Sequence, residues 1–120
     1  MAFAIIDGDD VGNKIESRIL ANDVTGFVRT SKMIADVVHN LVDYTSTLPG
    51  VTVISSGGDS VLLQVAEDSI ASLMEALEES QDPGVFTFSV GIGQTLRESF
   101  IALRVAKSSG KRRISIFADN

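Results

Sequence analysis

The stretch that decides the fold is "VTVISSGGDSVLLQV", residues 51–65. Two runs of aliphatic and β-branched residues, each typical of a buried strand, are joined here by Gly57, Gly58, Asp59 and Ser60. Parallel strands need a long crossover, whereas so short a connection permits only an antiparallel hairpin. The stretch therefore predicts strands over 51–56 and 60–66, with an acidic residue in the turn.

Helices and further strands are expected on both sides of this hairpin. Apolar periodicity and turn residues predict strands over 2–7, 85–93 and 112–118, and helices over 11–22, 30–47, 67–81 and from an N-cap at Thr95 to Gly110. The helical residues expected to point inward are Met33, Val37, Leu41, Tyr44, Leu48, Ile70, Leu73, Met74, Leu77, Leu96, Phe100 and Leu103. The order β-α-α-β-β-α-β-α-β predicts a single α+β domain over residues 1–120.

The composition restricts the ligands that the chain can bind. It has no cysteine and one histidine, so any metal is expected to be held by oxygen, which points to Mg²⁺, Mn²⁺ or Ca²⁺. A net charge of -6 argues against general nucleic-acid binding. The apolar run "MAFAII" is too short for a signal peptide and nothing later approaches a membrane span, so we expect a cytoplasmic protein.

Carboxylates follow the first predicted strand and recur in the hairpin turn. Asp7, Asp9 and Asp10 come at the end of "AFAIID" or directly after it. If that strand pairs beside the hairpin, Asp7 and Asp59 lie at adjacent strand ends and can share a hard divalent cation. The simpler alternatives remain open: Asp10 could cap the following helix, and Gly-Gly-Asp is also ordinary hairpin sequence.

Positive charge is concentrated near the C-terminal end of the chain. The Lys and Arg residues after position 96 are Arg97, Arg104, Lys107, Lys111, Arg112 and Arg113. Lys107, Lys111 and Arg112 cluster around the end of the last predicted helix, where they could receive phosphate groups. Alternatively, they could be the favourable positive charge that helix C-termini often carry.

Four segments together resemble a known family. "IIDGDDVGNKIE", "SSGGDSVLL", "FSVGIG" and "ALRVAKSSGKRRI" occur in the order of motifs in palm-type nucleotidyl cyclases and polymerases. They resemble the GGDEF diguanylate cyclases, the polymerase subunit of type III CRISPR complexes and, most closely, the minimal CRISPR polymerase (mCpol) domain. The resemblance covers nearly the whole chain. It implies a ferredoxin-like palm domain.

The resemblance also implies roles for individual residues. Asp7 and Asp59 would be the catalytic metal ligands for Mg²⁺ or Mn²⁺, assisted by the Gly8 carbonyl. The remaining residues implied to lie at the nucleotide are Asp9, Asp10, Asn13, Gly57, Gly58, Ser60, Lys107, Lys111 and Arg112, with Lys107 and Lys111 or Arg112 on the triphosphate. Ser60 stands where the relatives usually carry a second acid, which puts a second hairpin ligand in doubt.

The implied activity is the joining of nucleoside triphosphates into a cyclic dinucleotide or oligonucleotide, with release of pyrophosphate. The mCpol resemblance leans toward ATP, and it implies a signalling nucleotide in bacterial antiphage defence that a separate effector protein reads. Joining two nucleotides requires two sites, which a homodimer would supply.

Two other functions stay open at this point. A hydrophobic strand followed by Asp-x-Asp also begins the haloacid-dehalogenase-like phosphatases, in which Asp7 would be a nucleophile and Asp9 a general acid. That fold needs a parallel sheet, which the short hairpin argues against. The second alternative is a catalytically silent nucleotide-binding sensor, with Ser60 as a sign of lost activity.

Overall fold

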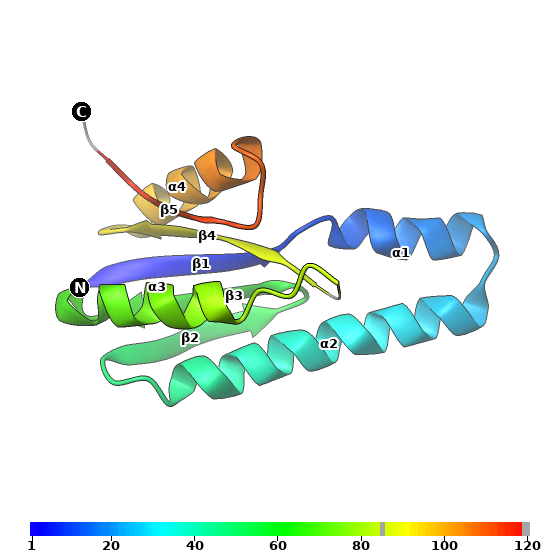
Figure 1. Cartoon of the computed structure of the whole chain (residues 1–120), viewed down its shortest axis with the longest axis horizontal. Helices are drawn as coiled ribbons and strands as arrows, with labels where there is room; N and C mark the ends of the chain where they lie inside the picture. The colour runs from blue at the N-terminus through cyan, green and yellow to red at the C-terminus, as the bar shows by residue number, and fades with distance from the viewer. Residues whose placement is uncertain (85, 119–120) are drawn as a thin grey trace.

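The computed structural model describes residues 1–84 and 86–118 and contains a mixed five-stranded sheet with helices on both faces (Figure 1). The strand order is β2-β3-β1-β4-β5. The elements along the chain are β1 (Ala2–Gly8), α1 (Val11–Leu20), α2 (Val24–Ser46), β2 (Val51–Gly57), β3 (Ser60–Val65), η1 (Glu67–Ser69), α3 (Ile70–Glu79), β4 (Phe88–Gly93), α4 (Leu96–Ser108) and β5 (Ile114–Ile116). The predicted α+β class and element order are confirmed.

The strand register places the ends of β1 and the hairpin side by side. β1 lies between β3 and β4 and is antiparallel to both, while β5 runs parallel to β4. Asp7 is paired with Ser60 across the β1–β3 ladder, and Gly57 with Ser60 across the hairpin. Gly58 has a φ of 59°, so the turn uses a backbone conformation that glycine adopts readily.

One face of the sheet carries the main hydrophobic core. Alternate strand residues such as Ala4, Ile6 and Leu63 are buried there beneath α2 and α3, which lie on the same side of the sheet (Figure 1). The predicted inward face of α3 is confirmed, because Leu73 and Leu77 are buried and Ile70 and Met74 pack against the core.

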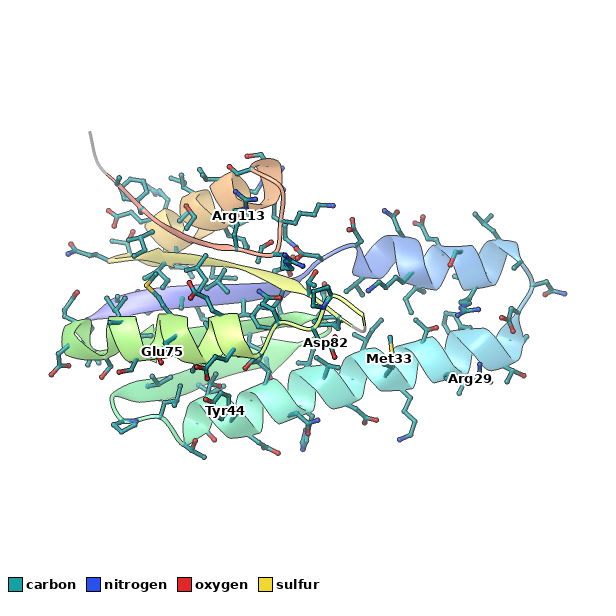
Figure 2. All side chains as sticks on the ribbon, viewed as in Figure 1. Arg29, Met33, Tyr44, Glu75, Asp82 and Arg113 are labelled. Carbon is teal, nitrogen blue, oxygen red and sulfur yellow. The ribbon has the colours of Figure 1, made fainter. Side chains whose placement is uncertain are left out.

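The predicted start of α2 is wrong, and its predicted inward face is only partly correct. The helix begins at Val24 rather than near Thr30, because the Asp23 side chain accepts a hydrogen bond from the Gly26 amide and caps an earlier turn. Its buried residues in the sheet-facing part are Ile34, Val38, Leu41 and Thr45. Of the predicted inward residues, Leu41 is confirmed, and Val37 and Leu48 are partly buried against the core. Tyr44 is 42% exposed and Met33 points toward α1 (Figure 2). The direction in which α2 packs on the sheet turns Ile34 and Val38, rather than Met33 and Tyr44, toward the core.

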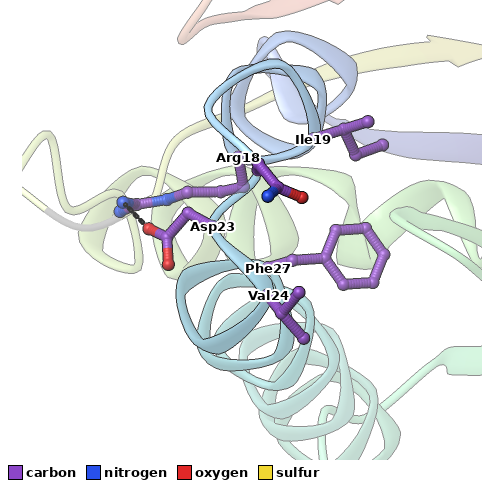
Figure 3. A pocket seen from close by; sticks show the side chains of 6 residues that line it. Arg18, Ile19, Asp23, Val24 and Phe27 are labelled. Carbon is purple, nitrogen blue, oxygen red and sulfur yellow. Dashed lines mark hydrogen bonds and ion pairs between the residues drawn. The ribbon is translucent and has the colours of Figure 1, made fainter.

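The first two helices form a hairpin that extends beyond the end of the sheet (Figure 1). At its turn Arg18 forms an ion pair with Asp23 at 3.2 Å, beside a small pocket that Ile19, Val24 and Phe27 also line (Figure 3). None of the helices within residues 1–84 and 86–118 has the length and apolarity required to cross a membrane.

The opposite face of the sheet is covered by α4, which packs closely on β4. A Cβ atom on Gly91 would lie 2.1 Å from the Ser99 carbonyl oxygen and 2.2 Å from the Leu103 nitrogen. The capping prediction is confirmed, since Thr95 accepts a hydrogen bond from the Glu98 amide at 3.1 Å. Glycine on the strand thus allows the helix backbone to lie directly on the sheet.

The predicted inward face of α4 is only partly correct. Leu103 is buried, together with Ser99, Ala102 and Ala106, but Leu96 and Phe100 are 53% and 54% exposed. Close approach to β4 favours small residues at the contact, so the two large side chains are turned away from it.

The last two strands are shorter than predicted. β4 begins at Phe88, and the expected start at Val85 lies outside the described residues. β5 begins at Ile114 because Lys111 and Arg112 have φ values of 62° and 48°, which interrupt an extended strand.

Replacing Gly91 by Ala should lower the free energy of unfolding by about 3 kcal/mol, because the new methyl group meets helix backbone that cannot move independently. Gly12→Ala is the matched control: no atom lies within 4 Å of its new Cβ, and alanine favours a helix by about 0.5–1 kcal/mol. Urea denaturation measures the free energy of unfolding of both variants. Equal midpoints for the two variants would contradict the close α4–β4 contact.

Candidate active site

Two carboxylates meet where β1 ends beside the β2–β3 turn. The Gly8 amide donates a hydrogen bond to the Asp59 carbonyl at 3.0 Å, which fixes the turn against the end of β1. Burial raises the pKa of the Asp59 carboxyl, and the negative charge of Asp7 raises it further. Neighbouring carboxylates repel each other in this way unless a cation lies between them.

A lysine ammonium lies against the end of β1. Lys107 Nζ donates to the Gly8 carbonyl at 2.8 Å and to Asp9 Oδ1 at 2.9 Å, and lies 3.1 Å from Asp7 Oδ2. Its side chain is only 19% exposed. Carbonyl and carboxylate oxygens therefore converge on one positive charge, at the position where the sequence predicts a divalent cation.

The donor set around Asp7 fits a hard divalent cation that also binds substrate. Asp7, Asp59 and the Gly8 carbonyl present oxygen atoms, the ligand type that Mg²⁺ and Mn²⁺ prefer. In the part of the chain that the structure describes, no three His, Cys, Asp or Glu side chains are grouped so that they could hold a metal. Two carboxylates and a carbonyl are a donor set from which Mg²⁺ is commonly held when substrate phosphates are also present.

Ser60 acts on Asp7. Its hydroxyl donates a short hydrogen bond to Asp7 Oδ1, across the β1–β3 pair. Ser60, which stands where the relatives usually carry a second hairpin acid, thus orients the carboxylate of Asp7. This contact was not predictable from the sequence, because the two residues are 53 positions apart.

Asp9 is an internal anchor. Its side chain is 3% exposed and accepts hydrogen bonds from Thr87 at 2.9 Å, Ser89 at 2.7 Å, Lys107 at 2.9 Å and the Arg112 amide at 3.0 Å. Burial raises the pKa of this carboxyl, but these donors more than offset burial and the pKa is lowered. Asp9 therefore joins β1, β4 and the turn after α4.

The turn that follows α4 contains backbone strain. Lys111 and Arg112 both have left-handed φ values without being glycine, which costs about 1–3 kcal/mol each. The Arg112 amide is held by Asp9, and the Lys111 ammonium forms a short ion pair with Asp10. This hydrogen bond raises the pKa of Lys111. Asp10 is the N-cap residue of α1, but its side chain makes no capping hydrogen bond, so that alternative is set aside.

The other predicted site residues lie on the exposed rim. Gly57 and Gly58 are exposed, with no atom within 4 Å of an added Cβ, so a ligand could approach the turn backbone. Asn13 is exposed on α1.

A groove of about 530 Å³ begins at this cluster and continues along α4. Asp7, Ser60, Lys107 and Lys111 line its polar end. The rest of the groove is lined by Ile5, Phe100, Leu103 and Arg104, none of which was predicted from the sequence to be a site residue. Their only signal was the alternation of β1 and the spacing of Phe100, Arg104 and Lys107 along α4.

Solved structures define the class of fold. The GGDEF domain of PA1120 from Pseudomonas aeruginosa is similar over 99% of this chain and 83% of its own, with 15% identity and a TM-score of 0.72. The GGDEF domain of DgcB from Caulobacter crescentus, in complex with c-di-GMP, matches over 96% and 76%, with 14% identity and a TM-score of 0.66. The fold is therefore the palm fold of GGDEF-like nucleotidyl cyclases.

Within this class of fold, the sequence matches one particular family. The family model for the minimal CRISPR polymerase domain (mCpol) matches residues 3–117, and the chain belongs to this family. The Csm1–Csm4 cassette in complex with pppApA is also similar, with 21% identity and a TM-score of 0.65 over 94% of this chain and 20% of that one. No curated protein matches. Family and fold together support a nucleotidyl cyclase-type function.

Proposed function

We propose that this chain is a metal-dependent nucleotidyltransferase that joins two nucleoside triphosphates, with ATP preferred, into a cyclic dinucleotide or oligonucleotide. The observation that carries the proposal is the convergence of Asp7, Asp59 and the Lys107 ammonium at adjacent strand ends, in a chain of the mCpol family. Phosphoryl transfer of this kind depends on positioning and charge stabilisation more than on a strong protein base.

Each part of the cluster has a role in this reaction. Asp7, Asp59 and the Gly8 carbonyl hold Mg²⁺ or Mn²⁺, and Ser60 keeps the Asp7 carboxylate oriented. Bound there, the ion would supply positive charge that stabilises the leaving pyrophosphate. Lys107, which Asp9 holds in place, supplies positive charge to the phosphates beside the ion.

The remaining predicted residues position the nucleotide. Lys111 and Arg112 attract the triphosphate from the turn after α4, and Gly57 and Gly58 allow it to approach the backbone. Asp10 and Asn13 lie at the rim near the start of α1. Asp9 contributes by holding Lys107 and the turn in place.

The chemical step is an in-line displacement. A ribose hydroxyl oxygen of one nucleotide attacks the α-phosphorus of another, the bond from that phosphorus to the bridging oxygen of the β-phosphate breaks, and pyrophosphate leaves. The hydroxyl proton passes to solvent. A second displacement of the same kind closes the ring.

The oligomeric state, the preferred nucleotide and the cellular role are proposed from the family and its structural relatives. Residues 1–120 form one domain with one nucleotide site, and a homodimer brings two sites together. The preference for ATP is supported by the Csm1–Csm4 structure, which is in complex with pppApA. We place the enzyme in the cytoplasm, where it supplies a signalling nucleotide in antiphage defence that a separate effector protein reads. We do not expect it to bind nucleic acid or membranes stably.

The phosphatase alternative loses its basis in this fold. β1 would have to lie in a parallel sheet, whereas it is antiparallel to both of its neighbours.

Incubation with each nucleoside triphosphate and Mg²⁺ or Mn²⁺ tests the proposal. We expect pyrophosphate release, fastest with ATP, and its loss on adding EDTA. Release of single phosphate groups would favour a phosphatase. Tight nucleotide binding without any turnover would favour a silent sensor.

A further inference from the structure

One face of β1 and β3 is apolar in composition but incompletely covered. Phe3 and Ile5 of β1 and Leu62 of β3 are half-buried there, whereas the alternate residues on the other face of these strands are buried. Ser60 and Gln64 complete the row on β3, and we call these five residues the floor. An antiparallel strand with one open face usually alternates between apolar and polar residues. β1 instead has the composition of a strand that is covered on both faces.

A helical ridge lies beside the floor. α4 covers β4 and part of β1, on the side of the sheet opposite to α2 and α3 (Figure 1). Its exposed side carries Leu96, Phe100, Ile101 and Val105, which are between 42% and 54% exposed, and we call these four residues the ridge. Single exposed apolar residues are ordinary, but four on one helix of 13 residues form a patch of the kind that marks interaction surfaces.

The ridge and the floor adjoin each other and the candidate active site. Ile5 of the floor and Phe100 of the ridge line the same groove of about 530 Å³, and Asp7, Ser60 and Lys107 line its polar end. Asp7 and Ser60 are paired across the β1–β3 ladder, on the face that carries Ile5 and Leu62. Whatever covers this face therefore also borders the active site.

A second copy of the chain fits this face because ridge and floor lie side by side. A two-fold axis that runs parallel to α4 between them places the ridge of each copy on the floor of the other. The second copy's α4 then lies over β3, two strands away from β4 and about 10 Å from the first α4. Helices that pack side by side are ordinarily this far apart.

The distribution of charge favours the same occupant. Arg97 and Arg104 are exposed on α4, and neither forms a hydrogen bond or an ion pair within residues 1–84 and 86–118. The floor ends beside the carboxylates of Asp7 and Asp59, and the chain as a whole has a net charge of -6. A positively charged helix therefore meets a negatively charged surface in this arrangement.

Resting on the proposed function, which includes a homodimer, we propose that a second copy of this chain covers the floor, with the two α4 helices parallel and side by side. Because the axis runs along the helices, both copies place Lys107, in the last turn of α4, at the same end of the dimer. The two clusters of Asp7, Asp59 and Lys107 then lie next to each other across the axis. Arg104 of each copy, about one turn before Lys107, borders the other copy's cluster.

Sedimentation of the full chain over a range of protein concentrations, without nucleotide, tests the proposal. Phe100→Glu and Ile101→Glu each place a charge in the apolar contact and should raise the dissociation constant of the dimer at least about tenfold. Tyr44→Glu is the matched control, because Tyr44 is a 42% exposed side chain of α2, on the other side of the sheet (Figure 2). It should leave the dissociation constant unchanged, and all three variants should melt near the wild-type temperature.

Cross-linking identifies the surfaces in contact. The chain has no cysteine, so each single-cysteine variant carries one thiol. After oxidation of a mixture of Ile101→Cys and Leu62→Cys, mass spectrometry of the digested dimer should find positions 62 and 101 joined by a disulfide. A mixture of Ile101→Cys and Tyr44→Cys should give no disulfide between positions 44 and 101.

The outcomes separate this proposal from the proposed function. A wild type that stays monomeric while it makes a cyclic product overturns the interface and sustains the function. A dimer that neither ridge variant weakens, that Tyr44→Glu weakens equally, or that shows no link between positions 62 and 101 overturns the assignment of this face. The expected dissociation and cross-link in a protein that forms no product from ATP sustain the interface and overturn the proposed function. A monomer without any product overturns both.

Discussion

Asp59→Asn is expected to reduce formation of the nucleotide product at least about 10³-fold, while the protein remains folded. The substitution keeps the size of the side chain but removes one of the two carboxylates proposed to hold the metal. Loss of metal-assisted charge stabilisation costs several kcal/mol of transition-state binding, and each 1.36 kcal/mol is about tenfold in rate. Product formed from ATP at saturating Mg²⁺ measures the effect.

The stability of Asp59→Asn should not fall with its activity. A loss of activity can therefore be distinguished from unfolding. The folded-state pKa of Asp59 is raised, so the stability contributed by this group is present below its unfolded pKa and lost as pH rises through the folded value. At neutral pH the ionised carboxylate therefore opposes folding. Asp59→Asn removes that cost, and its melting temperature at pH 7 should equal or exceed that of the wild type.

Asp68→Asn is the control for this experiment, because Asp68 is an exposed acid in η1, away from the groove. It should retain full activity. If Asp59→Asn kept more than a tenth of wild-type activity, Asp59 would not be an essential metal ligand.

Asp9→Asn is expected to lower the free energy of unfolding by about 3–5 kcal/mol, the usual cost of breaking a buried ion pair from one side. The neutral amide leaves the Lys107 ammonium with a weaker set of partners, and its NH₂ group places two donors in a site where the wild-type partners Thr87, Ser89 and Lys107 are themselves donors. Urea denaturation at pH 7 measures this change.

The pH dependence of the Asp9 effect has a definite sign. The pKa of Asp9 is lowered in the folded state, so its contribution is complete above the unfolded pKa, about 3.9, and is lost as pH falls through the folded value. The difference in stability between wild type and Asp9→Asn should therefore be constant near neutral pH and shrink below about pH 4.

Asp10→Asn provides the comparison for Asp9→Asn. Asp10 pairs with Lys111 at the surface, where both side chains are more than 40% exposed, so its loss should cost less than about 1 kcal/mol. Equal losses in the two variants would contradict the anchoring role of Asp9.

The sequence predicted the features that depend on local chemistry. Residues 51–65 determine the hairpin because strand periodicity and a Gly-Gly turn act over a few positions. The expectation that Asp7 and Asp59 meet then needed only the pairing of β1 with β3. Thr95 was recognisable as a cap for the same reason.

Features that depend on contacts between distant segments were not predictable. Phe100 fits an inward stripe by spacing, but the approach of α4 to Gly91 turns it outward. Asp9 resembles another member of an acidic loop, and its anchoring role exists only because Thr87 and Ser89, about 80 positions later, lie across the sheet from it.

The most direct test of the central claim is the mass of the product that the purified protein forms from ATP and Mg²⁺, compared with that of Asp59→Asn. The account predicts a cyclic adenine nucleotide, without terminal phosphates, in the wild-type reaction and unreacted ATP with the variant. ADP and phosphate as the sole products, or the same cyclic product in equal amount from Asp59→Asn, would contradict it.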